Sequence, residues 1–357
     1  MMSLKTNIGY QLLYSCLLLP PLLACSASKT NETLPSLDGE KHRGVCWVAS
    51  PNPLLGGELA ALSETGASHI SQTPFGWQAD IAAPELRWET HTDKMWWGES
   101  TTGLQATVDS AAELGLRSML KPHLWVRGSW PGEIAMKTET DWKRWFHNYK
   151  EFILYYAQFA EANALPLLCV GTELEKTSHR ENDGRAIIAA VREIYSGKLT
   201  YAANFTEYEK VRFWDALDYI GVQAYFPLAE GSDPDLAQLH RGWEKVLPTL
   251  DKVSRSFQKP ILFTELGYCD TRDAAQEPWL WPNQRKNATL SQEIQARCYQ
   301  AFFEAVWDKP WFQGVYFWKW YPRSRDRVPD FSPQNKLAQG VMKAFFREQA
   351  VSASGSR

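Results

Sequence analysis

The sequence predicts a single (β/α)8 barrel, or TIM barrel, that follows a signal and tether segment. Apolar runs of strand length alternate with amphipathic runs of helix length from residue 43 onward. The length of this region suits one barrel with insertions, and polar residues stand at the ends of several predicted strands, where barrel enzymes place their sites. We therefore assign residues 43–348 to one α/β barrel domain and predict a disordered tail at 349–357.

The alternation places eight strands and the helices between them. The predicted strands are 44–49, 68–73, 117–125, 167–172, 199–204, 219–225, 261–265 and 314–320. Helical stretches are predicted at 107–114, 142–162, 184–195, 236–257 and 291–307. The connections 74–103 and 269–290 are long and rich in tryptophan, which predicts that they form walls of a cleft at the C-terminal face of the barrel.

The first 25 residues have the pattern of a bacterial lipoprotein signal peptide. Lys5 supplies a positive charge, and the apolar stretch 12–23 is too short to span a bilayer. It ends in Leu22-Leu23-Ala24-Cys25, which resembles a lipobox, so we expect Cys25 to be acylated; an ordinary signal peptide is the alternative. Residues 26–42 are polar and predict a flexible tether. We expect an exported protein that is lipid-anchored to a bacterial membrane, at the outer membrane or the cell surface.

Net charge and aromatic content indicate which kind of molecule the protein binds. The net charge is −3, and no basic run or zinc-finger pattern favours nucleic acid. The chain contains 17 Trp, 14 Tyr and 16 Phe. Indole rings stack on the apolar faces of sugars, so this content favours an oligo- or polysaccharide partner, although any single Trp is more often part of the core. We expect a monomer without cofactor or metal, which meets the membrane only through its lipid anchor.

Two predicted strands end in a glutamate in similar surroundings. The segments are Val170-Gly171-Thr172-Glu173-Leu174 and Phe263-Thr264-Glu265-Leu266-Gly267-Tyr268. A carboxylate beside a buried strand is costly unless it is paired, hydrogen-bonded or used. Two strand ends of one barrel meet at the same rim, so we expect both carboxyls in one cleft, which is what glycoside hydrolysis requires. The alternative for each glutamate is a structural ion pair.

Other strand ends contribute polar and aromatic residues to the same rim. The expected set is Trp47, Gln72, Trp77, Lys121, His123, Trp125, Asn204, Gln223, Tyr225, Trp318 and Trp320. Lys121 is either a substrate hydrogen-bonder or half of a buried ion pair. His123 has no second ligand at metal spacing, so it is a polar site residue or a satisfied core histidine.

Four motifs resemble those of retaining clan A glycoside hydrolases, and more narrowly of glycoside hydrolase family 113, known for β-mannanases. The motifs are Leu120-Lys121-Pro122-His123, Gly171-Thr172-Glu173-Leu174, Thr264-Glu265-Leu266-Gly267-Tyr268 and Tyr316-Phe317-Trp318, and the resemblance covers residues 43 to about 345. It implies that Glu173 is the acid/base and Glu265 the nucleophile. It also implies that Tyr225 bonds the nucleophile and that Trp318 floors the sugar of the −1 subsite.

One departure from the clan pattern concerns the residue before the acid/base. Many clan members have Asn there, to bond the sugar 2-OH, whereas this chain has Thr172, as fits the narrower family. Asn204 and Lys121 are our candidates for that contact. A retaining mechanism needs carboxyls about 5–5.5 Å apart with different pKa values. We expect Tyr225 and His123 to hold Glu265 ionised, and like charge and apolar indoles to raise the pKa of Glu173.

The expected function is therefore retaining hydrolysis of β-1,4-mannosidic bonds in mannan or manno-oligosaccharides by double displacement. A glycosidase for another β-glycan, such as glucan or glucomannan, is the alternative within the enzyme class. A non-catalytic glycan-binding lipoprotein is the alternative outside it, and the presence of both carboxylates argues against it. Endo and exo action both stay open, as does a disulfide between Cys269 and Cys298.

Overall fold

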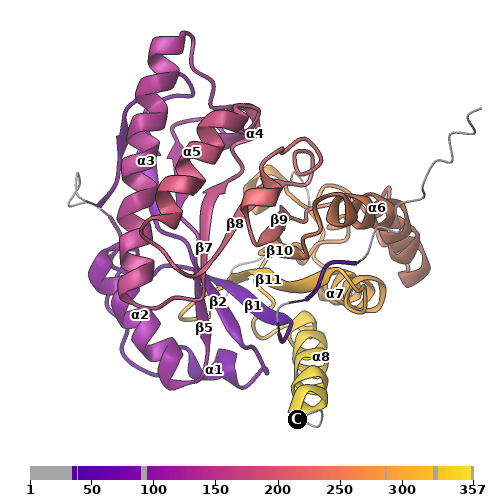
Figure 1. The fold of residues 1–357 in the computed structure, drawn as a ribbon. Helices are drawn as coiled ribbons and strands as arrows, with labels where there is room; N and C mark the ends of the chain where they lie inside the picture. Colours follow the sequence, from indigo (N-terminus) through magenta and orange to yellow (C-terminus); the bar gives the residue numbers. More distant parts are fainter. Residues whose placement is uncertain (1–33, 38, 90–94, 286–287, 325–328, 355–357) are drawn as a thin grey trace, which may run out of the picture. The chain divides into compact units, whose positions relative to one another are not determined.

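The predicted barrel is confirmed. The computed structural model describes residues 34–37, 39–89, 95–285, 288–324 and 329–354, so Cys25 and the predicted signal peptide lie outside the described residues. Parallel strands close into an eight-stranded barrel in which neighbours in space are also successive in the chain (Figure 1). The barrel strands are β1 (His42–Trp47), β2 (His69–Gln72), β5 (Arg117–Leu120), β7 (Leu167–Thr172), β8 (Lys198–Asn204), β9 (Tyr219–Gln223), β10 (Ile261–Leu266) and β11 (Phe312–Trp320).

Helices connect these strands and cover the outside of the barrel. They are α1 (Ala60–Ser63), α2 (Thr101–Glu113), α3 (Glu139–Ala162), α4 (Glu175–Ser178), α5 (Glu181–Arg192), α6 (Leu236–Phe257), α7 (Gln292–Val306) and α8 (Leu337–Ser354). Short 3₁₀ helices lie at Trp97–Glu99, Pro131–Glu133, Trp214–Ala216 and Pro282–Gln284. The aromatic stripe of α3, which includes Trp145, Phe152 and Tyr156, is buried against the strands as its helical spacing predicts.

The predicted strand 117–125 is wrong as a single strand. The chain forms β5 in the barrel, breaks at Pro122, and then forms β6 (His123–Val126) in a second sheet. Proline has no N–H for a strand ladder, so the barrel ladder ends there. The second sheet has the order β4-β3-β6, with β3 (Phe75–Gln78) and β4 (Leu86–Arg87) formed by the predicted long connection 74–103.

The predicted disordered tail is also wrong over most of its length. Helix α8 continues to Ser354, past the expected boundary at residue 348. Its apolar residues pack on α7, with the rings of Phe345 and Phe303 stacked at 4.4 Å between centroids. Because a helix docked along one side propagates at little cost through the following residues, α8 continues past the expected boundary.

Three clusters of buried side chains form the core of the described residues. The largest lies between the strands and the surrounding helices, and the smallest consists of Tyr225, Cys269 and Phe331. The third lies inside the barrel with one residue from each of six strands: Cys46, Met119, Leu167, Tyr219, Leu262 and Tyr316. Cys269 and Cys298 are buried free thiols, so the disulfide is not formed. The barrel interior is therefore packed, and chemistry takes place at its rim.

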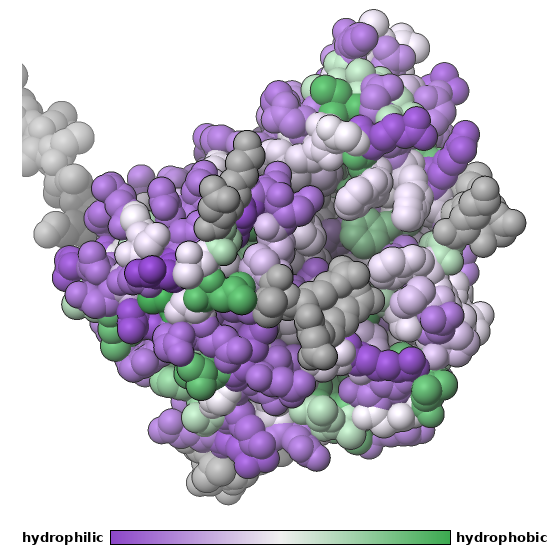
Figure 2. Space-filling model, turned by 180° about the vertical axis from the view of Figure 1, so that it is seen from behind, coloured by the Kyte–Doolittle hydropathy of each residue, from purple (hydrophilic) through white to green (hydrophobic). Residues whose placement is uncertain are grey.

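The face seen in Figure 2 is largely hydrophilic, with hydrophobic residues in small separate patches. Within the described ranges, each helix is either too short or too polar to cross a bilayer.

Candidate active site

Glu173 follows the last residue of β7 and projects from a left-handed backbone conformation, with φ of 52°. Its N–H donates to the carbonyl of Ala202 at 2.8 Å, which keeps the residue attached to the neighbouring strand. The Trp130 indole donates to Oε2 at 2.8 Å and the Asn204 amide donates to Oε1 at 3.2 Å. Burial, and then the charge of Glu265, raise the pKa of Glu173 to about 7. At neutral pH this carboxyl is therefore available in its acid form, as predicted.

Glu265 lies within β10 and has very different partners. The Tyr225 hydroxyl donates to Oε2 at 2.8 Å, as predicted, and the Lys121 ammonium lies 2.5 Å from Oε1. Burial and the charge of Glu265 raise the pKa of Tyr225 well above its usual range, so its hydroxyl stays a donor. An ammonium and a hydroxyl both match the ionised carboxylate.

Lys121 is therefore half of a buried ion pair, the second of the two alternatives. Its side chain has no exposed surface and also donates to the carbonyl of Thr264 at 3.2 Å. The prediction that Lys121 binds substrate is wrong, because the lysine lies two residues after Met119, points with it into the barrel toward β10, and has no exposed surface. Asn204, the other candidate for the sugar 2-OH, is nine-tenths buried and bonds Glu173.

His123 does not make the predicted hydrogen bond to Glu265. Its Nε2 lies 3.8 Å from Oε1 of Glu265 and has no hydrogen-bond partner. Burial, and then the positive charge of Lys121, lower the pKa of His123 well below its usual range. The histidine is therefore a neutral ring beside the carboxylate of Glu265. The contact with that carboxylate that was expected of His123 is made by Lys121 instead.

The predicted tryptophans divide into two groups. Trp47 and Trp320 are only 3% and 1% exposed and belong to the main core, so the prediction that they bind substrate is wrong. Trp47 follows Cys46, which points into the barrel, so strand alternation directs its ring toward the helices. In β11 a register irregularity between Phe317 and Trp320 places Trp320 on the same outer side. Trp318 and Trp77 keep partly open rings, and Trp318 lies beside the ion pair, with Lys121 Nζ 6.0 Å from its ring centroid.

Sequence reasoning missed two residues that shape the environment of Glu173. Trp130 follows β6 in a turn, where no periodicity marks it. Glu207 is completely buried and accepts from the Tyr201 hydroxyl at 2.6 Å and from the Asn204 N–H at 3.1 Å. The same Tyr201 hydroxyl accepts from the N–H of Leu174 at 2.9 Å. Through the Tyr201 hydroxyl, Glu207 holds the backbone of Leu174, the residue after Glu173. Through the backbone N–H of Asn204, it also holds the residue whose side-chain amide donates to Glu173.

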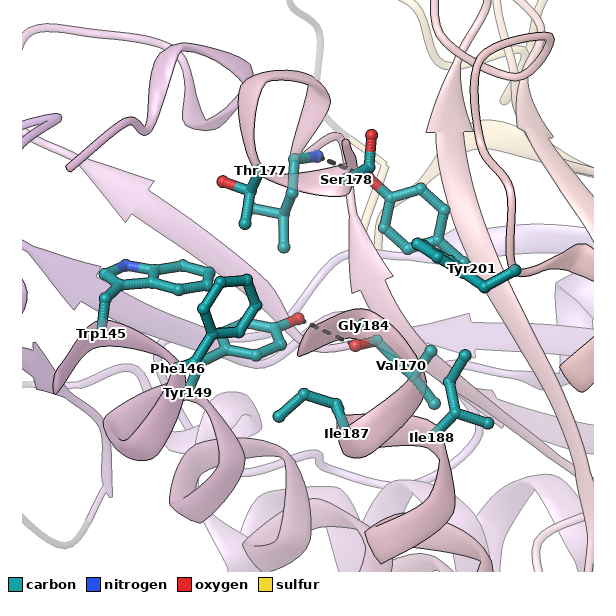
Figure 3. Close-up of a pocket in the computed structure, with 12 residues that line it drawn as sticks. Trp145, Phe146, Tyr149, Val170, Thr177, Ser178, Gly184, Ile187, Ile188 and Tyr201 are labelled. Atoms are coloured by element: carbon teal, nitrogen blue, oxygen red, sulfur yellow. Dashed lines mark hydrogen bonds between the residues drawn. The ribbon is translucent and has the colours of Figure 1, made fainter. Parts of the chain in front are cut away.

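A small cavity of about 40 Å³ lies behind this loop, outside the barrel (Figure 3). Side chains of α3, α5 and β7 line it, among them Trp145, Ile187 and Val170, and the Tyr149 hydroxyl donates to the Val170 carbonyl at 2.9 Å. Its lining is almost entirely apolar, so it suits no sugar. Among the described side chains, no cluster of three His, Cys, Asp or Glu residues has metal-binding geometry.

A barrel rim that holds an acidic carboxyl of pKa about 7 beside a cation-balanced carboxylate is the arrangement of a glycoside hydrolase. The sequence comparison identifies the group within this class. The model of Glycoside Hydrolase Family 113 matches residues 55–332, and the chain belongs to that family.

Solved structures agree with this assignment. A family 113 β-mannanase from Alicyclobacillus acidocaldarius, in complex with ManMIm, is 27% identical with a TM-score of 0.76, and the match covers 87% of this chain and 99% of that one. A family 113 β-1,4-mannanase complex is 25% identical with a TM-score of 0.75, covering 86% and 99%. A family 5 mannosidase from Rhizomucor miehei, at 13% identity and a TM-score of 0.59, covering 88% and 94%, shares the fold. Functionally curated protein sequences gave no significant match.

Proposed function

We propose that this protein hydrolyses β-1,4-mannosidic bonds in mannan or manno-oligosaccharides with retention of configuration. The observation that carries the proposal is the contrast between two glutamates at one rim, of which Glu173 is half-buried and Glu265 is buried. Glu173 has neutral donors and a raised pKa, and Glu265 has a buried ammonium partner. The β-mannanase activity of the similar family 113 structures supports mannan as the substrate.

In the first step, Glu265 attacks the anomeric carbon while Glu173 gives its proton to the departing glycosidic oxygen. The C–O bond of the glycoside breaks, and an ester bond between the sugar and Glu265 forms. The electron pair of the broken bond stays on the leaving oxygen, which departs as a hydroxyl. Tyr225 and Lys121 hold the attacking carboxylate in place through the contacts already described.

In the second step, Glu173 removes a proton from water, which attacks the same carbon and releases Glu265 as a carboxylate. The charges of the site support this exchange of roles. Once Glu265 is an ester, its negative charge no longer raises the pKa of Glu173, whereas the charge of Lys121 still lowers it. Glu173 is then the stronger acid and remains ionised, as a general base must.

The test is to incubate the protein with mannohexaose, cellohexaose and xylohexaose and to follow the anomeric protons of the first products by NMR. We expect fastest cleavage of mannohexaose, with the β-anomer formed first. Fastest cleavage of cellohexaose would favour the glucan alternative. An α-anomer as first product would contradict the retaining mechanism, and binding without cleavage of any hexaose would favour the non-catalytic glycan-binding protein.

We also propose that Cys25 is acylated and that the polar residues between Cys25 and β1 tether the barrel to a bacterial membrane, at the outer membrane or the cell surface; the expected tether boundary at residue 42 is wrong, because His42 begins β1. The support is the spacing Leu22-Leu23-Ala24-Cys25 and the polar composition that follows it. We expect Cys25→Ser to move the protein from the membrane fraction to the soluble fraction of the cell. Unchanged fractionation of the variant would contradict the anchor.

A further inference from the structure

We propose that the small sheet of β4, β3 and β6 is a glycan-binding platform, which extends the catalytic cleft and holds sugar units beyond the bond that is cleaved. The proposal rests on the proposed function, because its ligand is the continuing chain of the same neutral β-linked hexose substrate.

One face of this sheet is sealed against the core. β3 and β6 are parallel, and alternate residues of both strands are buried: Gly76, Gln78, Leu124 and Val126. A Cβ atom at Gly76 would lie only 2.8 Å from the ring of Phe152 on α3, so the sheet packs closely on that helix. The remaining residues of the two strands therefore share the opposite face.

That opposite face consists of rings at all four paired positions. Phe75 pairs with His123 and Trp77 pairs with Trp125. The ring of Phe75 lies 5.3 Å from that of His123 and 6.3 Å from those of both Trp77 and Trp125, between centroids. The solvent side of a sheet is ordinarily polar, yet here Trp125 is 59% exposed. An aromatic face of this kind indicates a ligand that covers it.

The platform is continuous with the catalytic centre. His123 is its innermost ring and lies 3.8 Å from Glu265. Trp125 stands two residues further along β6, about 6–7 Å away, a step comparable with one hexose ring. The turn that follows β6 supplies Trp130, which donates to Glu173. A glycan whose reacting bond lies between the two glutamates thus has the rings of Trp125 and Trp77 beside its next units.

The edge of the platform provides polar groups. Arg87 on β4 pairs with Trp77 and is exposed, so its guanidinium lies at the rim of the aromatic face. Flat rings that cover the apolar faces of sugars, bordered by a donor for hydroxyl groups, are the surroundings that a neutral polysaccharide requires. The platform therefore selects for chain length, while the chemistry takes place at the two glutamates.

The test separates binding from catalysis. In a Glu265→Gln background, titration calorimetry with mannohexaose measures the effect of Trp125→Ala. We expect Kd to rise about tenfold, in line with the loss of one large aromatic contact. Trp125→Phe keeps a ring and should retain most of the affinity. Leu114→Ala is the matched control, because Leu114 is 40% exposed and caps α2 at the opposite end of the barrel.

Kinetics on the active enzyme provide the second arm. For Trp125→Ala, we expect the loss of kcat/KM on mannohexaose to exceed the loss on an aryl β-mannoside by at least about fivefold. Equal losses on both substrates, or an unchanged Kd in the calorimetry, would overturn the platform while leaving the proposed function intact. Binding of mannohexaose that depends on Trp125, in a protein that hydrolyses no glycan, would support the platform and contradict the proposed function.

Discussion

The surroundings of Glu173 and Glu265 differ in the charge of their hydrogen-bond partners. Both carboxyls lie at the same rim of parallel strands, Glu173 partly exposed and Glu265 buried. The partners of Glu173 are an indole N–H and an amide, which are neutral, whereas those of Glu265 are a hydroxyl and an ammonium. Burial alone would favour the protonated form of both carboxyls. The comparison teaches that the formal charge of one buried partner, Lys121, is what distinguishes the two carboxyls, and the proposed division into nucleophile and proton donor rests on it.

The largest expected effects come from replacing each of the two glutamates by alanine. Glu265→Ala removes the nucleophile, so kcat should fall by more than about 10⁴-fold on every substrate. Glu173→Ala should retain the first step on an aryl mannoside whose phenol leaves without a proton. Azide should restore turnover with retained configuration for the Glu173 variant and with inverted configuration for the Glu265 variant. Wild-type rates in both variants would contradict the assignment of Glu173 as the acid/base and Glu265 as the nucleophile.

Next in size is the loss of the cation that distinguishes the two sites. Lys121→Met leaves the Glu265 carboxylate buried without its partner, so the free energy of unfolding should fall by about 3–5 kcal/mol. We expect kcat of the folded variant to fall at least about 100-fold, because Glu265 is then favoured in its protonated form. Urea denaturation and steady-state kinetics measure the two effects.

The control for this variant is Arg144→Met, which breaks an exposed ion pair with Glu85 on the surface of α3. Its effect on the free energy of unfolding should stay within about 1 kcal/mol. Equal destabilisation by Lys121→Met and Arg144→Met would show that burial of the Lys121–Glu265 pair does not increase the cost of breaking it.

A smaller effect concerns stability rather than rate. The pKa of folded Glu173 is about 7, above its ordinary value of 4.5, so ionising this group destabilises the fold as pH rises between those values. Glu173→Gln removes this group, so its stability relative to the wild type should increase from pH 5 to pH 8, by about 2–3 kcal/mol. Urea denaturation at both pH values measures the difference. A relative stability that does not change with pH would contradict the raised pKa.

The smallest expected effects are shifts in the pH dependence of the rate, which report the pKa of Glu173. The rate should fall as pH rises through about 7, because Glu173 must be protonated to act as the acid. The Trp130 hydrogen bond lowers this pKa and the charge of Glu207 raises it. Trp130→Phe should therefore move the alkaline limb of kcat/KM to higher pH, and Glu207→Gln should move it to lower pH, each by less than about one unit. Shifts of the same sign would contradict this account.

The residues that sequence predicted correctly lie where one simple rule applies. Alternating strands and helices predict the barrel, and a glutamate at the end of a buried strand predicts a carboxyl at the rim. The positions of Glu173 and Glu265 at the rim follow from this, whereas the contact from Tyr225 follows from the resemblance to the family. The two glutamate positions need only the direction of a parallel strand, which the topology of a barrel determines.

The errors have different causes. Lys121 lies two residues after Met119 and points into the barrel with it, so it pairs with Glu265, whereas the break at Pro122 places His123 in another sheet. Trp47 follows the inward-pointing Cys46, so its ring faces the helices, and a register irregularity in β11 places Trp320 on that outer side. A shift of one residue exchanges the two faces of a strand, and no periodicity in the sequence reports it. Turn residues such as Trp130 have no periodicity at all.

The break at Pro122 also has an evolutionary consequence. One short stretch supplies the ammonium that balances Glu265, the rings of the second sheet and the indole that bonds Glu173. Under the proposed function, substitutions in this stretch affect two properties at once: a change that alters the preferred substrate length also alters the surroundings of Glu173 and Glu265. Exchange of residues 121–130 between relatives would transfer both properties together, as one heritable unit, while the rest of the barrel stays the same.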